Sequence, residues 1–511
     1  MQTTLQEHVE TKPVQFSETA LKVSFMIMGM GTLFAYNAFV SCIDYFEAIN
    51  PSIENVSGQM VSFQLTAMFL VTLALLPFST LIKKDQTLCR DEWGMRNLRS
   101  SSFSIRLSYH SKRCWGNIKP WIEIAYPENR VLFGFVFTFL FLLVFLILPR
   151  KPNMITLNVF STFIGIADAM SQSGLYVLAA SYDKPSYSAA ATMGGALSGF
   201  IVSILRLVTR SLYDTNTVGG LRKGANLLIW LAFSFEVILI ITVVLIKKDH
   251  DRYKAWIRLR HHGPLESELQ NQVDDDESGS NKENSSDILH TSEHNSSTLN
   301  RQSSLIVQVA NIYKVTFVQV WKPIVSAFFN FFITLSLFPG VVVSIPTSSS
   351  VPSLGNWLAV VNITVFNGAD CLGRYICMKE TWIPYRLLLR KHEILSNEDD
   401  SIRQNHGFKQ LVHYNKLVWY PTIMRIVFYP LFGLCVVRAV NDLLSCFVVF
   451  LFGLSSGFIH CSNFTVAPTV VQSEESRNAT SLLLLLSIFI GLCGGAYFGL
   501  AVENIISSFH K

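Results

Sequence analysis

Charged residues are scarce in this chain of 511 residues: Asp, Glu, Lys and Arg make up 15% of it, whereas hydrophobic residues make up 50%. A soluble domain of ordinary composition carries about 25% charged residues. Long uncharged runs are typical of helices that cross a lipid bilayer, each of which needs about 20 consecutive apolar residues. The composition therefore predicts an all-α polytopic membrane protein and excludes a soluble globular domain.

The chain also lacks the motifs of several functional classes. Its nine cysteines are scattered without disulfide or zinc spacing, and no apolar segment contains a His-x-x-x-x-His or Glu-x-x-His pattern. We therefore expect neither a metal nor another cofactor, and we expect that the protein is not an enzyme. No filter sequence or repeated ring of pore-lining residues indicates a channel.

Eleven apolar segments have the length of a membrane span. Six precede a polar stretch and five follow it, which predicts eleven transmembrane helices in two bundles of six and five that move about a central site. No internal sequence repeat supports this division, so it depends on the number of segments and on the linker. The predicted spans are 21–46, 58–82, 131–149, 154–180, 187–209, 225–246, 323–345, 355–378, 419–438, 443–470 and 481–506.

The polar stretch between the two sets has an acidic centre and a Ser- and Asn-rich continuation, with too few apolar residues to fold. We expect it to be a largely disordered linker, except at 304–321, where apolar residues return and an interfacial helix is predicted. The predicted parts are a tail at 1–20, a first bundle at 21–246 with a loop at 83–128, a linker at 247–322 and a second bundle at 323–511.

Lysine and arginine are concentrated in alternate loops. They are frequent in 83–119, 247–260 and 386–416 and rare in the loops between these. The positive-inside rule then predicts that the amino terminus is cytoplasmic and the carboxyl terminus extracellular, most simply in the plasma membrane. The net charge of +5 thus reflects topology and not affinity for nucleic acid. Asn55 begins a glycosylation sequon in a predicted outer loop.

One predicted span carries an acid and a base one helical turn apart. Asp370 and Arg374 lie in the run FNGADCLGR that begins at Phe366, and their spacing places them on one helix face. Each charge near the bilayer centre costs about 2.5–3.5 kcal/mol on insertion scales, so the pair should face its partner or a wet cavity. The pattern indicates either a ligand site or a salt bridge that only locks the helix.

Two signatures in the right order resemble the equilibrative nucleoside transporter family, and its plant and protist members in particular. The first span contains GMGTLFAYNAF from Gly29 to Phe39, which is similar to the family's opening Gly-x-Gly-x-Leu and aromatic-Asn pattern. The run that begins at Phe366 matches the family's Phe-Asn-x-x-Asp-x-x-Gly-Arg motif at every fixed position. Shorter matches lie at 165–174, 338–339 and 425–431.

The resemblance implies a major-facilitator-like carrier that moves nucleosides or nucleobases by alternating access, either facilitatively or coupled to protons. A carrier of another small polar solute, such as a sugar, is the alternative. The positions that match the family's substrate contacts are Gln172, Asn367, Asp370 and Arg374.

The chemistry of these residues suits such a substrate. A carboxylate acceptor and a guanidinium donor can together satisfy the vicinal hydroxyls of a ribose, which both donate and accept. Leu33 and Tyr36 can form an apolar wall for the base. Tyr36 stands where many members of the family have Trp, which bears on substrate preference.

Other polar residues within the spans favour structural roles. We expect Asn37 to bond across helices, and Gly373 and Arg425 to serve in packing or gating. His460 is either a proton site or a hydrogen-bonded packing residue, of which the second is favoured. Glu475 precedes the last span and is either a gate contact or a solvated charge. Pairs of small residues typical of close helix crossings occur at 195 and 199, 453 and 457, and 491 and 495.

Overall fold

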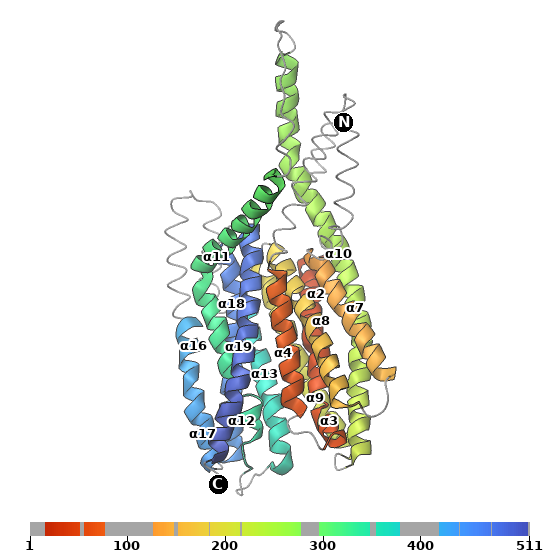
Figure 1. Ribbon diagram of the computed structural model, residues 1–511, viewed down its shortest axis with the longest axis vertical. Coiled ribbons are helices and arrows are strands. Elements are labelled where there is room, and N and C mark those ends of the chain that lie inside the picture. The colour runs from red at the N-terminus through yellow and green to blue at the C-terminus, as the bar shows by residue number, and fades with distance from the viewer. Residues whose placement is uncertain are drawn as a thin grey trace.

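The computed structural model describes residues 16–51, 56–76, 126–147, 152–182, 184–214, 217–276, 296–347, 354–378, 418–438, 440–471 and 473–508. Every regular element within these ranges is a helix, and most of them run side by side along the long axis of the molecule (Figure 1). The predicted all-α class is therefore confirmed.

The first group of helices comes from the amino-terminal half of the chain. α2 packs along α9, while α4 and α7 both pack against α8 and α10 covers α2 and α7. A Cβ atom on Gly29 of α2 would overlap the carbonyl of Ala191 in α9, so only glycine permits this close crossing. The elements are α2 (Glu18–Val40), α3 (Ile43–Ile49), α4 (Val56–Leu75), α7 (Pro127–Ile147), α8 (Met154–Ser181), α9 (Pro185–Leu212) and α10 (Val218–Asp276).

The second group comes from the carboxyl-terminal half. Its most extensive contacts join α11 to α19 and α13 to α18. Glycines again set the approach, because a Cβ on Gly457 would overlap the Asp370 carbonyl and one on Gly495 would lie 2.5 Å from the Phe332 carbonyl. The elements are α11 (Ser296–Leu337), α12 (Gly340–Val343), η1 (Gly355–Trp357), α13 (Leu358–Met378), α16 (Tyr420–Met424), η3 (Arg425–Val427), α17 (Phe428–Arg438), α18 (Asp442–Val470) and α19 (Glu474–Ser508).

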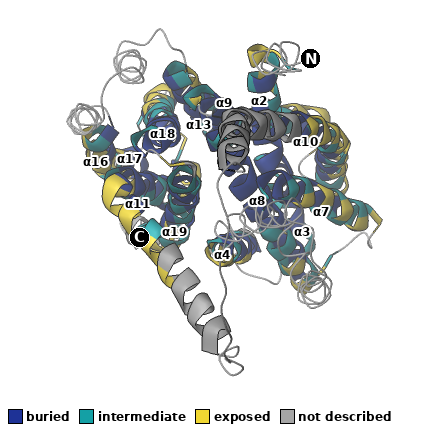
Figure 2. Cartoon of the chain, turned by 90° about the horizontal axis from the view of Figure 1, so that it is seen from above, coloured by how far each residue is buried: buried dark blue, intermediate teal, exposed yellow. Residues whose placement is uncertain are grey.

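The two groups lie next to each other when the molecule is viewed along its long axis (Figure 2). α9 of the first group contacts α13 and α18 of the second, and α4 and α8 contact α19. The faces at this boundary are largely buried, whereas the outer faces of α10, α16 and α17 expose many large apolar side chains. Exposed apolar surface of this extent is what a lipid-facing helix requires.

Nine helices within the described ranges are long and apolar enough to cross a membrane. Two further helices lie among them: α4, whose apolar part spans Gln59–Leu75, and α13, which contains the ion-paired residues. The polar content of α13 explains why it fails a hydropathy criterion although it lies within the bundle. These helices are compatible with the eleven predicted spans.

Helix extends into both ends of the segment predicted as a linker. α10 continues to Asp276, and α11 begins at Ser296 and includes the helix predicted at 304–321. Residues 277–295 lie outside the described residues, as do Asn55 and nearly all of the loop at 83–128. The prediction of disorder considered apolar content alone, whereas the Lys, Arg, Leu, Glu and Gln residues after 246 are strong helix formers. The division into two bundles at 247–322 stays a prediction.

Candidate binding site between the two helix groups

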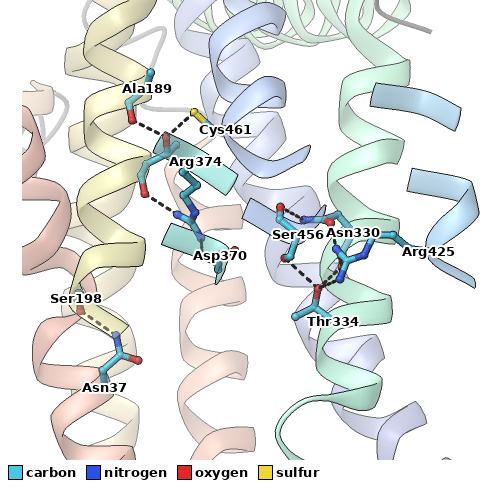
Figure 3. A network of polar contacts seen from close by, with 11 residues as sticks. Asn37, Ala189, Ser198, Asn330, Thr334, Asp370, Arg374, Arg425, Ser456 and Cys461 are labelled. Atoms are coloured by element: carbon cyan, nitrogen blue, oxygen red, sulfur yellow. Dashed lines mark hydrogen bonds and ion pairs between the residues drawn. The ribbon is translucent and has the colours of Figure 1, made fainter. Parts of the chain in front are cut away.

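Asp370 and Arg374 form a buried ion pair on α13. Arg374 Nη2 lies 2.8 Å from Asp370 Oδ2, and each residue is only 7% exposed. Arg374 also reaches across the boundary, because its Nη1 donates to the backbone carbonyl of Thr192 on α9 at 2.6 Å (Figure 3). The pair thus does more than lock its own helix: it connects the second helix group to the first.

A second buried arginine lies behind this pair, on the far side of α18. Arg425 donates to Asn330 Oδ1 and, at 3.0 Å, to Thr334 Oγ1, and its guanidinium carbon lies 4.6 Å from the centre of the Phe452 ring. Thr334 in turn contacts Ser456, which lies beside the Asp370 carboxylate (Figure 3). Neutral acceptors therefore hold Arg425 in place, and its charge acts on Asp370 from the side opposite to Arg374.

Two asparagines extend the polar contacts along the same boundary. Asn367 Nδ2 donates to Ser203 Oγ of α9 at 2.6 Å, which is another bond between the groups. Asn37 Nδ2 donates to Ser198 Oγ at 2.9 Å, which is the interhelical role predicted for it. Small hydroxyl residues of α9 thus supply acceptors to both neighbouring helices.

Gly195 and Gly199 do not serve the role predicted for them. A Cβ on Gly195 would lie 3.5 Å from both Arg374 Nη1 and Leu33 Cδ1, and one on Gly199 would lie 3.3 Å from Asn367 Oδ1. These nearest neighbours are side-chain atoms from two other helices, and the nearest backbone atom, the Gly29 carbonyl oxygen, lies 3.9 Å from a Cβ on Gly195. The neighbouring Gly194 makes the close crossing instead, because a Cβ there would overlap the Met26 carbonyl. Gly195 and Gly199 leave room next to the polar side chains.

Gln172 and His460 are buried without hydrogen bonds. Each is 6% exposed, and neither Gln172 Nε2 nor either ring nitrogen of His460 has a hydrogen-bond partner among the described residues. The prediction that His460 is a hydrogen-bonded packing residue is therefore wrong. Its ring stacks on Phe464 and meets Phe331 at an angle of 72°, and neither of these rings offers a conventional hydrogen-bond partner to its nitrogens.

The remaining predicted residues, Tyr36, Gly373 and Glu475, lie on α2, α13 and α19. Tyr36 is half-buried on α2 near Asp168, whose carboxylate accepts from Gln64 Nε2 at 3.0 Å. Gly373 packs against the Leu454 carbonyl of α18, and Glu475 is half-buried at the start of α19.

Sequence reasoning missed the contribution of α9. Thr192, Gly195, Gly199 and Ser203 follow one another at helical spacing and form one face of that helix, and this face meets Arg374, Leu33 and Asn367. The signal was present in the sequence as a run of small residues with hydroxyl groups. It was interpreted as a packing motif because small residues serve that purpose in most membrane helices.

Comparison with known proteins agrees with the two signatures. Residues 154–389, which include α8, α9, α13 and the ion pair, match the family described as nucleoside transporter. Nearly half of the chain, including the ion pair, is therefore similar to the nucleoside transporter family. Among its relatives, equilibrative nucleotide transporter 7 of Arabidopsis thaliana is 23% identical over 479 residues, which cover 92% of each chain.

Other similar proteins match over shorter stretches. Nucleoside transporter 2 of Leishmania donovani is 28% identical over 200 residues, which cover 38% of this chain and 32% of that protein. Among solved structures, a proton:xylose symporter of the major facilitator superfamily is similar with a TM-score of 0.49 and 7% identity, over 97% of this chain and 96% of that chain.

Proposed function

We propose that this transporter carries nucleosides across the membrane by alternating access between its two helix groups, with the ribose on Asp370 and Arg374. The observation that carries the proposal is the Arg374 contact with the Thr192 carbonyl, which joins the groups at the ion pair. The match to the nucleoside transporter family and the names of the relatives support a nucleoside as the substrate.

The ion pair suits a ribose without any covalent step. Asp370 can accept from two hydroxyls, and Arg374 can donate to their lone pairs, so neither group needs to change its protonation state. A ribose oxygen that takes the place of the Thr192 carbonyl would release the bond between the groups. In this proposal, substrate binding and the relative movement of the groups are coupled through one guanidinium.

The base would occupy the space next to the α9 glycines. Leu33 lies opposite Gly195 and offers an apolar wall, and Asn367 lies opposite Gly199 and offers both a donor and an acceptor. Gln172 offers the same combination from α8. We propose these residues, with Tyr36, as the surroundings of the base, and Asn37, Gly373, Arg425 and Glu475 as packing or gating residues.

Competition for uptake tests the proposal. Cells without nucleoside carriers of their own would express the protein and take up labelled adenosine in the presence of uridine, inosine, adenine or glucose, at two pH values. Inhibition by the nucleosides and not by glucose is expected. Inhibition by glucose alone would favour the alternative, a sugar carrier. Substrate-dependent current that grows at low pH would add protons as a co-substrate, and its absence would mean facilitative transport.

We also propose that the carrier lies in the plasma membrane with a cytoplasmic amino terminus. The alternating basic loops support this orientation, which places Asn55 outside. Glycosidase treatment of the wild-type protein should increase its mobility on a gel, whereas Asn55→Gln should have no carbohydrate to lose. An epitope at the carboxyl terminus should be accessible on intact cells, and accessibility of the amino terminus instead would reverse the topology.

A further inference from the structure

Three polar side chains with unpaired atoms lie at the boundary between the helix groups. They are Gln172 on α8, with Nε2 unpaired; His460 on α18, with both ring nitrogens unpaired; and Arg374 on α13, with Nε unpaired among the described residues. Each residue is more than nine-tenths buried. Buried polar groups in proteins nearly always have a hydrogen-bond partner, so unpaired groups from three helices at one place call for an explanation.

A contact between aromatic rings places Gln172 and His460 opposite each other. Tyr176 of α8 and Phe464 of α18 stack across the boundary with ring centres 4.2 Å apart and an angle of 28° between the planes. α8 and α18 run in the same direction (Figure 1). Gln172 and His460 each precede their stacked ring by four residues, which is one helical turn. They therefore lie at one level, immediately beyond the stack.

Arg374 belongs to the same place. Its guanidinium charge acts on both Tyr176 and His460. Cys461, the residue after His460, accepts from Thr192 Oγ1 at 3.4 Å, and the Thr192 carbonyl accepts from Arg374. His460 is thus close to the ion pair already assigned to the substrate, and the aromatic stack closes one side of this region.

The surroundings of His460 fix the plane of its ring and leave its edge unpaired. Phe464 lies nearly parallel to the imidazole at 5.3 Å, and Phe331 approaches it at 4.9 Å with an angle of 72°. A neutral imidazole presents one donor and one acceptor, and the Gln172 carboxamide presents the same combination. A ligand that satisfies both must carry adjacent donors and acceptors in one plane, as the polar edge of a nucleobase does.

We propose that His460 binds the polar edge of the heterocyclic base together with Gln172, and that the Tyr176 and Phe464 rings form the floor of the base site. The inference rests on the proposed function and extends it, because it adds a specificity-determining residue from α18 of the second helix group. Base recognition then draws on both groups, so the base as well as the ribose connects them.

Equilibrium binding to the purified protein tests the assignment. The variants are His460→Phe, which keeps a flat ring without hydrogen bonds, and His460→Asn, which keeps a donor and an acceptor. Ser445→Ala is the matched control, because Ser445 is buried on the same helix and its hydroxyl donates to the Asp442 carbonyl of that helix. The ligands are adenosine, purine riboside without the 6-amino group, 1-deazaadenosine without the ring acceptor, and 3′-deoxyadenosine.

We expect His460→Phe to weaken adenosine binding about tenfold or more, and His460→Asn to weaken it less. At least one of the two base analogues should bind the wild type and His460→Phe within twofold of each other, because it lacks the group that His460 recognises. 3′-Deoxyadenosine should lose as much affinity as adenosine, and Ser445→Ala should bind like the wild type. A melting temperature measured for each variant identifies folded protein, and His460→Asn is assessed in the same way if His460→Phe does not fold.

Three outcomes would overturn the inference. An equal loss for every ligand would mean that His460 only supports the structure, and no loss for any ligand would mean that it does not touch the substrate. A loss for adenosine and both base analogues, but not for 3′-deoxyadenosine, would place His460 at the sugar. Failure of the wild-type protein to bind any nucleoside would instead overturn the proposed function itself.

Discussion

The two helix groups differ in how their buried charges are arranged. The first group buries the carboxylates of Asp168 and Glu236, and neither forms an ion pair among the described residues. The second group buries two arginines, Arg374 and Arg425, whose charges both act on the Asp370 carboxylate. Among the described residues, the buried charges Asp370, Arg374 and Arg425 of the second group form a set of contacts that reaches the boundary.

The difference indicates that the two groups contribute different components to the proposed site. The second group supplies charged groups held by α11, α13 and α18, whereas the first supplies neutral acceptors and space through the Thr192, Gly195, Gly199 and Ser203 face of α9. A charged group needs rigid support because it must keep its partner when it leaves water. Hydroxyls, carbonyls and glycines do not need such rigid support. They therefore suit the α9 face, which is the surface against which the charged groups move.

The largest effect should follow from breaking the ion pair. Asp370→Asn or Arg374→Ala leaves one buried charge without its partner, which costs about 3–5 kcal/mol, so saturable nucleoside uptake should fall by about 100-fold or more. Uptake and surface biotinylation are measured together. The matched control is Lys184→Ala, which breaks the exposed contact between Lys184 and Glu18 and should leave uptake within twofold. Wild-type uptake by either ion-pair variant would refute the site assignment.

Filling the space on α9 should have the next largest effect. Gly195→Leu places a side chain against Arg374 and Leu33, so the maximal rate of uptake should decrease about tenfold or more without loss of surface expression. Gly433→Leu is the control, because nothing lies within 4 Å of a Cβ at that position. Equal uptake by the two leucine variants would show that the α9 face is not part of the transport path.

Replacing Arg425 should lower the stability of the protein more than its affinity for nucleoside. Arg425→Met removes the donor to Asn330 and Thr334, and we expect a loss of stability of about 2–4 kcal/mol and a lower melting temperature in detergent. The fraction of the variant that remains folded should bind nucleoside with an apparent affinity within threefold of the wild type, because α18 lies between Arg425 and the proposed site. A large change in affinity with an unchanged melting temperature would make Arg425 a binding residue.

The smallest effect should come from Gln172. Gln172→Ala removes a donor and an acceptor from the first group, which should change the ratio of adenosine to uridine uptake by about three- to tenfold while total transport remains measurable. Asn37→Ala is a suitable comparison, because its bond to Ser198 lies within the first group and should affect both nucleosides equally. An unchanged ratio in Gln172→Ala would remove Gln172 from base recognition.

Much of this architecture could be predicted from the sequence because hydropathy is a local property. Apolar length located the helices, and the spacing of Asp370 and Arg374 placed them on one face. The partner of Arg374 could not be predicted in this way, because it is a backbone carbonyl of a helix more than 180 residues away. The lack of hydrogen bonds at His460 could not be predicted either, since it depends on the three-dimensional surroundings of the ring, where Phe331 and Phe464 pack.

The bond between Arg374 and the Thr192 carbonyl has a consequence for mutational scanning. Its acceptor is part of the main chain, so every replacement at position 192 that keeps the helix also keeps the acceptor. An alanine scan of α9 would test only the Thr192 side chain, which makes its own contact with Cys461 Sγ, and would leave the carbonyl acceptor in place. Replacing the amide bond itself, by incorporating the α-hydroxy acid at position 193 so that the Thr192 carbonyl becomes a weaker ester acceptor, would reveal what side-chain substitution cannot.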